Sequence, residues 1–276
     1  MFKHFRFFLI FVVLSLLIIS SRQAFAQKGF YLQPFFMYQY TNLANYRDHY
    51  YSKFDFVSTY KPDYGLRAIY NFTNAVGFET GLKYSNQGQK YKGHIDTDGN
   101  TGDSVNQDWT SELKLNYIQI PLMISFNSIL ANFDEMQDPL YMSIAMGVQI
   151  DYLTNAIMIV NPGIDSFAIK YPNAQAQFKN FFNNFNLSFV GNVGLNLQLK
   201  HGWQINTTLY ASKTLGDVEN GDYKKKEYVF DKTQFPLEYQ FPISVKKEAL
   251  STDPRYKTKN LVYGLMLGFS YSFNHK

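Results

Sequence analysis

The feature that most constrains this chain is an alternation of large apolar residues with small or polar ones, in segments of about ten residues. Successive side chains of a β-strand point to opposite faces, so each segment predicts a strand with one apolar face. The clearest case is 261–273, where every second residue from Leu261 to Phe273 is large and apolar. After residue 27 no apolar run approaches the roughly 18 residues that a membrane helix needs, which argues against a helical membrane protein.

Eight segments show this alternation and are predicted to be strands. They are 30–40, 64–72, 75–91, 113–127, 140–152, 185–200, 203–213 and 261–273. In 113–127 the apolar residues change parity after Tyr117, which predicts a one-residue β-bulge near that position. Pro121 has no N–H group to donate, so this strand is predicted to pair imperfectly there.

The connections between these segments alternate in length. The long ones are 41–63, 92–112, 155–184 and 214–259. The shorter ones are 73–74, 128–139 and 201–202. An up-and-down meander with an even number of strands puts all long connections at one end, as outer-membrane barrels do. A soluble β-sandwich, the alternative for such strands, has no reason to sort its connections in this way.

The fold class predicted from these patterns is all-β, an antiparallel up-and-down transmembrane β-barrel of eight strands. Ten strands remain open if an extra hairpin lies in 155–184 or 214–259. Aromatic residues make up 18% of the chain and gather near the ends of the predicted strands. Aromatic rings favour the level of the lipid headgroups, which supports the membrane interpretation. The alternative is the ordinary preference of aromatic residues for strands.

The first 26 residues are predicted to be a signal peptide. Lys3 and Arg6 precede an apolar run at 7–19, and Ala24 and Ala26 form a small-x-small cleavage site. A retained membrane helix is the alternative, but the run is short for one. The chain is therefore divided into a signal peptide at 1–26 and one outer-membrane barrel domain at 27–276, with both termini expected in the periplasm.

Charge and cysteine content exclude several functions. Three of the 26 basic residues lie in the predicted signal peptide, which leaves 23 basic against 22 acidic residues. This balance does not favour a nucleic-acid partner. The chain has no cysteine, so disulfides, a lipoprotein anchor and thiolate metal sites are excluded.

The inward parity of the predicted strands carries polar residues. They are Arg67, Glu79, Lys83, Gln149, Asp151, Asn192, Asn196, Gln198, Gln204, Asn206 and Tyr210. An eight-stranded barrel is just wide enough for side chains to fill. A closed polar plug of paired charges is therefore favoured over a narrow ion or solute path, because buried charges must be paired to be tolerated.

Catalytic, cofactor and metal sites are not predicted. After the signal peptide the chain has four histidines, His49, His94, His201 and His275, and none shows a nucleophile at a useful spacing. A hydrolase at the barrel rim, working through His49 or His94, is kept as an alternative. The run from Asp96 to Asp103 resembles part of a calcium loop, but it lacks the complete ligand set and is read first as turn chemistry.

The run Lys224–Lys226 lies in a segment whose basic residues are mostly balanced by acidic ones. A solvated loop is the simpler interpretation of this run. Contact of these lysines with the phosphates of lipopolysaccharide is the more specific alternative.

Several short motifs resemble one family. Tyr117-Ile118-Gln119-Ile120-Pro121-Leu122 resembles the Tyr-hydrophobic-x-hydrophobic-Pro-Leu core of the PorT-like outer-membrane barrels of Bacteroidota. The glycine-rich segment 77–91, the Gly191-x-x-Gly194 spacing and the aromatic ending 267–273 look like other strands of that family. Three residues after Phe273 and the long stretch 214–259 depart from its pattern.

The resemblance implies an integral outer-membrane protein and transfers no catalytic residue. The function predicted is a structural or interaction role at the cell surface, without catalysis. A component of a type IX secretion or gliding apparatus is one alternative, and a narrow channel or a rim hydrolase is another. The expected partners are outer-membrane lipid and lipopolysaccharide, the barrel assembly machinery and other envelope or secretion proteins.

Overall fold

The computed structural model describes residues 28–45, 54–97, 105–133, 138–161, 178–220 and 257–273. The strands are β1 (Gly29–Ala44), β2 (Phe54–Val57), β3 (Thr59–Asn71), β4 (Val76–Thr97), β5 (Val105–Phe133), β6 (Asp138–Asn161), β7 (Phe185–Gln198), β8 (Trp203–Thr214) and β9 (Lys259–Ser272). Two short 3-10 helices, η1 (Phe178–Phe181) and η2 (Lys200–Gly202), lie in connections. Within these ranges no helix is long and apolar enough to cross a membrane.

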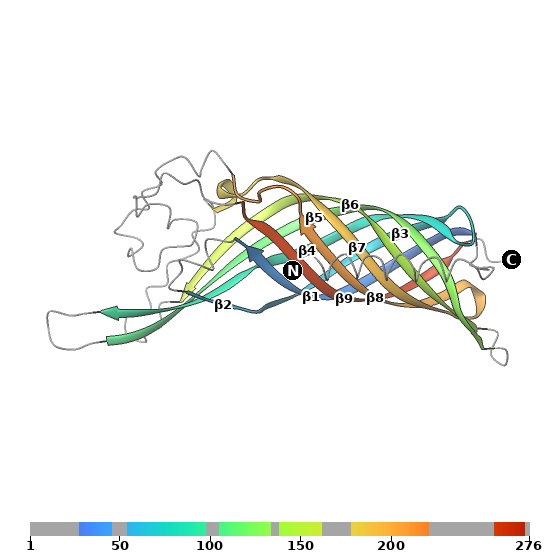
Figure 1. The fold of residues 1–276 in the computed structure, drawn as a ribbon, viewed down its shortest axis with the longest axis horizontal. Coiled ribbons are helices and arrows are strands. Elements are labelled where there is room, and N and C mark those ends of the chain that lie inside the picture. The colour runs from blue at the N-terminus through green and yellow to red at the C-terminus, as the bar shows by residue number, and fades with distance from the viewer. Residues whose placement is uncertain are drawn as a thin grey trace, which may run out of the picture.

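Eight of the strands form a closed antiparallel barrel (Figure 1). The order is β4-β3-β1-β9-β8-β7-β6-β5, and pairing of β4 with β5 closes the ring. Each predicted strand segment corresponds to one barrel strand, so the eight-stranded prediction is confirmed and the ten-stranded alternative is wrong. The short strand β2 was not predicted; it lies in the expected long connection 41–63 and, among the described strands, pairs with β4 alone.

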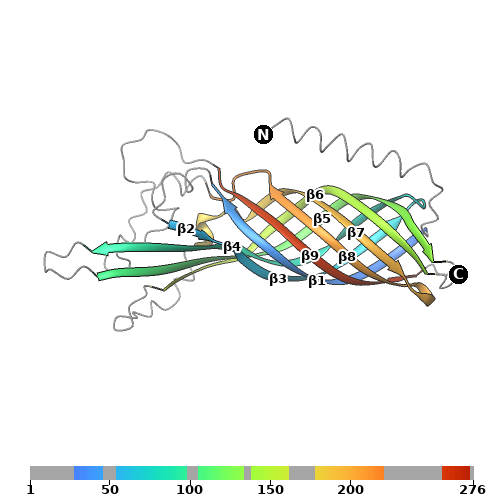
Figure 2. The ribbon, with the colours of Figure 1, turned by 60° about the horizontal axis from the view of Figure 1, so that its bottom comes forward.

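Long and short connections lie at opposite ends of the barrel, as predicted. The first and last barrel strands meet at the short-turn end, where the Phe273 N–H donates to the Phe30 carbonyl over 3.1 Å. At the long-loop end the hairpin of β4 and β5 extends beyond the other strands (Figure 2). The prediction of a loop over 92–112 is therefore wrong in large part, because β4 continues to Thr97 and β5 begins at Val105.

Side chains alternate between the lumen and the outer surface on every barrel strand. On β7, for example, the even-numbered residues from Asn186 to Asn192 are buried, while Phe185, Leu187 and Phe189 are exposed on the outside. The polar face of each predicted strand thus lines the lumen. The large apolar face forms the outer surface, the reverse of a soluble sandwich.

A register shift lies at the predicted position, between Asn116 and Tyr117, but its extra residue is on β6 and not on β5 as predicted. Alternation on β5 is unbroken from Ser111 to Phe126, because Leu113, Leu115 and Tyr117 point inward like Gln119. The apolar parity changes because the outward residues of β5 are apolar from Ile118 onward and polar before it. The inward residues Leu113 and Leu115 belong to an apolar cluster inside the barrel. The irregularity in register lies across from this point, where Thr154 is the extra residue on β6.

Proline positions interrupt the ladders. Pro121 pairs with β6 through Gln149, but Gly81 and Leu82 of β4 have no partner in β5 opposite it. The imperfect pairing predicted at Pro121 is confirmed. Pro62 acts similarly, since residues 59–63 of β3 pair with β1 but not with β4. Both gaps border β4, which makes it the least regularly paired strand of the wall.

Candidate functional site: a filled lumen inside an apolar belt

The outer surface of the barrel carries a continuous apolar belt. Large hydrophobic side chains on it are widely exposed, including Leu209 at 65% and Leu82 at 55%. A water-soluble protein rarely exposes an apolar patch of more than a few hundred Å². An antiparallel barrel with an apolar outer band, short turns at one end and longer loops at the other has the architecture of an outer-membrane barrel.

Two girdles of aromatic residues border the belt. At the short-turn end the ring centroids of Phe30 and Phe273 lie 5.7 Å apart, and Trp203 stacks on Phe269 at 4.8 Å. The long-loop girdle is formed by pairs of the same kind. These are Tyr38 with Tyr60, Tyr64 with Tyr84, and Tyr152 with Phe185.

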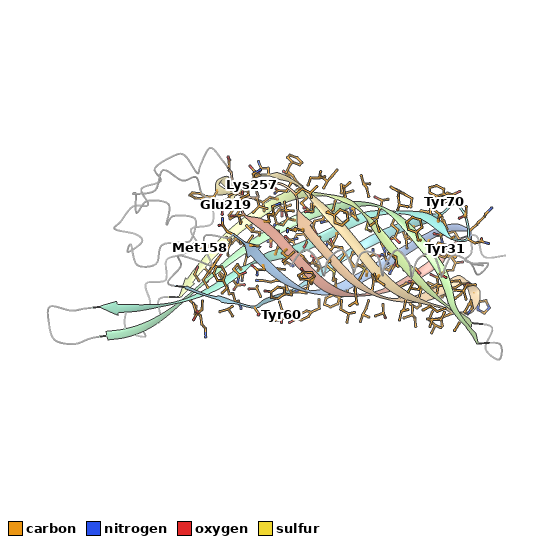
Figure 3. All side chains as sticks on the ribbon, in the orientation of Figure 1. Tyr31, Tyr60, Tyr70, Met158, Glu219 and Lys257 are labelled. Carbon is orange, nitrogen blue, oxygen red and sulfur yellow. The ribbon has the colours of Figure 1, made fainter. Side chains whose placement is uncertain are left out.

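The spacing of the girdles fits a bilayer. Figure 3 shows Tyr70 near one end of the barrel and Tyr60 well toward the other. On β1 the short-turn girdle contains Phe30, and the long-loop girdle contains Tyr38 and Tyr40. This separation matches the roughly 9–11 residues with which a tilted strand spans the hydrocarbon core. The predicted aromatic belts are confirmed in part, because Tyr31, Tyr91, Phe181 and Phe182, which the sequence assigned to them, are buried inside the barrel.

The lumen near the short-turn end is organised by a buried ion pair. The guanidinium of Arg67 on β3 donates to the Glu79 carboxylate on β4 over 3.0 Å, and the two residues are 5% and 2% exposed. Arg67 also donates twice to the Gln33 amide oxygen, over 3.0 and 2.6 Å. Such partners are what a buried charge needs to be tolerated.

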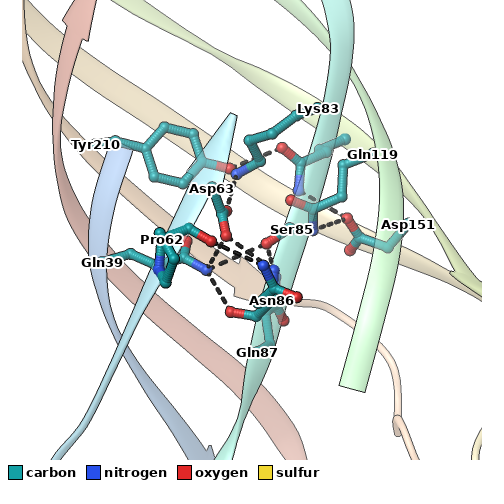
Figure 4. A network of polar contacts seen from close by, with 11 residues as sticks. Gln39, Pro62, Asp63, Lys83, Ser85, Asn86, Gln87, Gln119, Asp151 and Tyr210 are labelled. Atoms are coloured by element: carbon teal, nitrogen blue, oxygen red, sulfur yellow. Dashed lines mark hydrogen bonds and ion pairs between the residues drawn. The ribbon is translucent and has the colours of Figure 1, made fainter. Parts of the chain in front are cut away.

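A second network fills the middle of the lumen (Figure 4). The Lys83 ammonium lies 3.8 Å from the Asp63 carboxylate and 4.0 Å from the centre of the Tyr210 ring. The Tyr210 hydroxyl donates to Gln149 over 2.7 Å, and Gln149 donates to Asp151 over 2.7 Å. An ion pair, a cation–ring contact and hydrogen bonds therefore connect residues of β3, β4, β6 and β8 across the lumen.

Side chains replace the missing ladder between β3 and β4. The Asn86 N–H donates to the Asp63 carboxylate over 2.8 Å, and the Gln39 amide donates to the Asn86 carbonyl over 2.7 Å. Farther toward the long-loop end, the Lys90 N–H donates to the Thr59 hydroxyl over 3.0 Å. This seam holds the wall together where Pro62 interrupts backbone pairing.

An apolar cluster closes the long-loop end of the lumen. Its members are Leu43, Leu113, Leu115, Tyr117, Leu153, Ala156, Met158, Phe181, Phe182 and Val218. Backbone hydrogen bonds join residues 181–183 to residues 218–220 at this end of the barrel. In one of them the Asn183 N–H donates to the Val218 carbonyl over 2.8 Å. We call this the apolar cap.

Two small cavities lie in the described part of the lumen. A cavity of about 40 Å³ lies toward the short-turn end, beside Arg67, Glu79 and Asn206. A second, of about 20 Å³, lies beside Lys83 and Tyr210. One water needs roughly 10–15 Å³ by this kind of measure, so these volumes hold a few waters. The arrangement fits the polar plug better than a solute path.

Every inward polar residue predicted from the sequence lines the lumen. Nine of the eleven are buried, and Asn196 and Gln204 are half-buried. The sequence reasoning missed Gln33, Gln39, Asp63 and Gln119. The first two and Gln119 lie on the inward parity of predicted strands, so that parity could have found them. Asp63 lay in an expected loop, one residue before a predicted strand.

The remaining candidates are less informative. His49, His275, Lys224–Lys226 and the 98–103 part of the calcium-like run lie outside the described residues. His94 is part of strand β4, and His201 lies in η2 with a φ of 62°. In the described ranges no group of three or more His, Asp or Glu side chains could hold a metal ion.

The outer face of β3, β4 and β5 holds a charge cluster above the long-loop girdle. The Lys61 ammonium forms an ion pair with Glu112, and the Lys114 ammonium lies 3.8 Å from the same carboxylate. Partial burial would raise the pKa of Glu112. The hydrogen bond from Lys61 and the charges of Lys61, Lys114 and Lys90 outweigh that effect and lower it.

Comparison with solved structures finds matches at low sequence identity. The outer membrane protein OprG from Pseudomonas aeruginosa is 12% identical, with a TM-score of 0.34, over 91% of this chain and 98% of its own. Neisserial surface protein A is 9% identical, with a TM-score of 0.39, over 89% and 98%. Ail, the attachment invasion locus protein of Yersinia pestis, is 8% identical, with a TM-score of 0.29, over 89% and 100%. No protein-family model matches the sequence, and no curated protein does.

Proposed function

We propose that this chain is an integral outer-membrane protein with a structural or interaction role at the cell surface, and that it neither catalyses a reaction nor conducts solutes. The observation that carries the proposal is the filled lumen. A buried ion pair, a hydrogen-bonded layer and the apolar cap follow one another along the barrel axis. What the barrel offers to partners is therefore its rim, its loops and its outer wall.

The long-loop end is the side on which we expect partners. The β4–β5 hairpin extends beyond the rest of the barrel there (Figure 2). In this proposal residues 1–26 are a signal peptide, both termini are periplasmic and the long loops are extracellular. Outer-membrane lipid and lipopolysaccharide would surround the wall. The barrel assembly machinery would insert the protein, and other envelope proteins would bind the loops.

A component of a type IX secretion or gliding apparatus is the second candidate, from the resemblance to PorT-like barrels. Its support is the sequence resemblance of 117–122, and the structure adds only where these residues lie in the barrel. Tyr117 is buried in the apolar cap, Ile118 and Ile120 face outward, and Pro121 interrupts the ladder to β4. Loss of secretion or gliding after gene deletion, restored by the wild-type gene, would support this role. Unchanged secretion would exclude it.

Planar-bilayer recording tests the plug. We expect no steady conductance from the purified, folded protein. A Phe182→Ala variant, which thins the apolar cap, should stay closed as well, because the two polar layers below remain in place. Reproducible single-channel steps from the wild-type protein would contradict the proposal and favour the narrow channel. Turnover of a lipid or ester substrate abolished by His49→Ala or His94→Ala would favour the rim hydrolase.

A further inference from the structure

Four lysines gather on β3, β4 and β5 above the long-loop girdle. These are Lys61, Lys90, Lys92 and Lys114, which we call the lysine cluster. In the register of β4 and β5, Lys90 lies opposite Glu112 and Lys114 opposite Gly88, so Lys90 and Lys114 are diagonal neighbours. Diagonal residues on an antiparallel pair lie about 7–8 Å apart, close enough for two long cations to contact one phosphate.

Three of the four lysines are exposed, Lys61 is largely buried with 13% of its side chain exposed, and the cluster has a cationic excess. Lys90 and Lys92 are exposed, and the side chain of Lys114 is 37% exposed. Two anions lie beside the four cations: Glu112 and, opposite Lys92 in the β2–β4 register, Asp55. Glu112 is already held by Lys61 and Lys114. In the described ranges no side-chain hydrogen bond or ion pair engages the ammonium group of Lys90 or of Lys92.

The height of the cluster matches the charged layer of a membrane. Lys114 lies four residues beyond the outward-facing Ile118, and Lys90 lies six beyond the girdle residue Tyr84. With a rise of about 3.3 Å per residue and a tilt near 45°, their Cα atoms are roughly 10–15 Å above the girdle. Lysine side chains extend back toward an interface, so the ammonium groups can reach the headgroups and the sugars attached to them.

The neighbouring sequence supports a localised band of positive charge. Between Lys92 and Lys114 the chain has no Lys or Arg, and four aspartates occur at Asp96, Asp98, Asp103 and Asp108. The cations are thus confined to the part of the hairpin that leaves the lipid. On the adjoining strand, Ile159 lies opposite Glu112 and is 43% exposed, which adds apolar surface beside the charges.

We propose that the lysine cluster binds the phosphate groups of lipopolysaccharide in the outer leaflet. This inference rests on the proposed outer-membrane placement and extends it by assigning a lipid site to one side of the wall. A phosphorylated glycolipid matches the site because it brings several anionic groups to the headgroup level and acyl chains to the belt below. Lysine ammonium groups bind phosphate as point charges, without the fixed geometry that arginine would impose.

The test uses the full mature chain folded in nanodiscs of zwitterionic lipid. Binding is titrated with lipopolysaccharide and with the same lipopolysaccharide after enzymatic removal of its phosphates. The cluster variant is Lys90→Gln/Lys92→Gln/Lys114→Gln. The control is Lys28→Gln/Lys179→Gln/Lys257→Gln, which removes the same charge from lysines away from the β4–β5 face. A heat-dependent gel shift verifies that each variant is folded.

We expect the cluster variant to bind lipopolysaccharide on the order of 100-fold more weakly, at roughly fivefold per lysine near an anionic surface. The control should bind like the wild type, and removal of the phosphates should reduce wild-type binding to the level of the cluster variant. Equal loss in both variants, or unchanged binding by the cluster variant, would overturn the proposal. So would displacement by millimolar inorganic phosphate, which would indicate a site for a soluble anion. If the outer-membrane placement itself were wrong, the wild-type protein would show no gel shift in any lipid.

Discussion

Among single residues, Arg67 has the most demanding position in the lumen. Arg67 is only 5% exposed, so Glu79 and Gln33 must satisfy its guanidinium. Removing one partner of a buried ion pair leaves an uncompensated charge, which costs more than losing the pair altogether. The effects of mutating Arg67 and Glu79 on the free energy of unfolding should therefore be strongly non-additive.

We predict that Arg67→Met lowers the free energy of unfolding by about 3–5 kcal/mol, because Glu79 loses its cation. The double variant Arg67→Met/Glu79→Met should recover most of that loss. The measurement is the urea midpoint of the folded band on a gel, with Lys28→Gln as an exposed-charge control. A double variant that is less stable than Arg67→Met would show that the pair itself, and not the orphaned charge, sets the cost.

Gly88 marks a second demanding position. Its φ is +139°, and a Cβ atom there would come within 1.9 Å of the Leu113 carbonyl oxygen. We predict that Gly88→Ala destabilises the barrel by about 1–3 kcal/mol, because neither the backbone conformation nor the neighbouring strand admits a side chain. Gly191→Ala is the matched control, since its Cβ would meet nothing closer than 3.6 Å. Equal urea midpoints for the two variants would refute this account.

Residue-level prediction from the sequence worked where parity alone decides orientation. Glu79, Lys83 and Asp151 are inward because a strand offers only two faces. Partners could not be predicted, because pairing across the lumen depends on the register between strands. Asp63, the anion nearest Lys83, was missed for the further reason that the apolar pattern begins only at Tyr64.

Among the elements, β4 has the most irregular pairing, with a gap to β3 on one side and a gap to β5 on the other. Side-chain hydrogen bonds at the β3–β4 seam substitute for ladder bonds. Each is worth about as much as an ordinary hydrogen bond, roughly 0.5–1.5 kcal/mol. The seam should therefore open locally more often than the regular ladder between β6 and β7.

We predict that Thr59→Val speeds hydrogen exchange of the Lys90 amide by about tenfold, because the hydroxyl that accepts from this N–H is removed. Exchange followed by NMR on the barrel in micelles would measure it. Thr207→Val, an isosteric change on the exposed outer face of β8, should leave the Lys90 amide unchanged. Unaltered exchange in Thr59→Val would mean that another group protects Lys90.

The β4–β5 hairpin and β5 itself show what a hydrophobic pattern can and cannot reveal about an element. Above the lipid the outward residues become polar, so the alternation disappears although the backbone ladder continues to Thr97 and Val105. The same transition on β5 imitates a β-bulge, because the apolar residues move from the outer face to the apolar cap. The sequence pattern thus reports the surroundings of a strand. For that reason it did not predict the ends of the strands that lie outside the membrane.

For the whole molecule, the outer wall is the feature that decides the environment. The belt is bounded by two aromatic girdles. An apolar surface of this kind is stable in contact with lipid or detergent and not in water. Architecture was predictable because it needs only alternation and the sorting of connection lengths. The role of the loops was not predictable, because binding depends on their conformation and chemistry rather than on periodicity.

We predict that Leu209→Arg, on the lipid face about midway along β8, lowers the free energy of unfolding by about 2–4 kcal/mol. Asn116→Arg, outward on β5 just beyond the belt, should cost at most about 1 kcal/mol, because the charge lies near the interface. Unfolding in phospholipid vesicles measures both. Similar costs at the two positions would contradict the placement of the belt.

The central claim is that the chain forms a closed barrel that spans the outer membrane. Its most direct test is the gel mobility of the native protein from outer-membrane fractions, with and without boiling. We predict that the protein fractionates with the outer membrane and that the unboiled sample migrates differently from the boiled one, because a closed ladder of eight strands resists detergent. A single mobility, with the protein recovered in the soluble periplasmic fraction, would contradict the account.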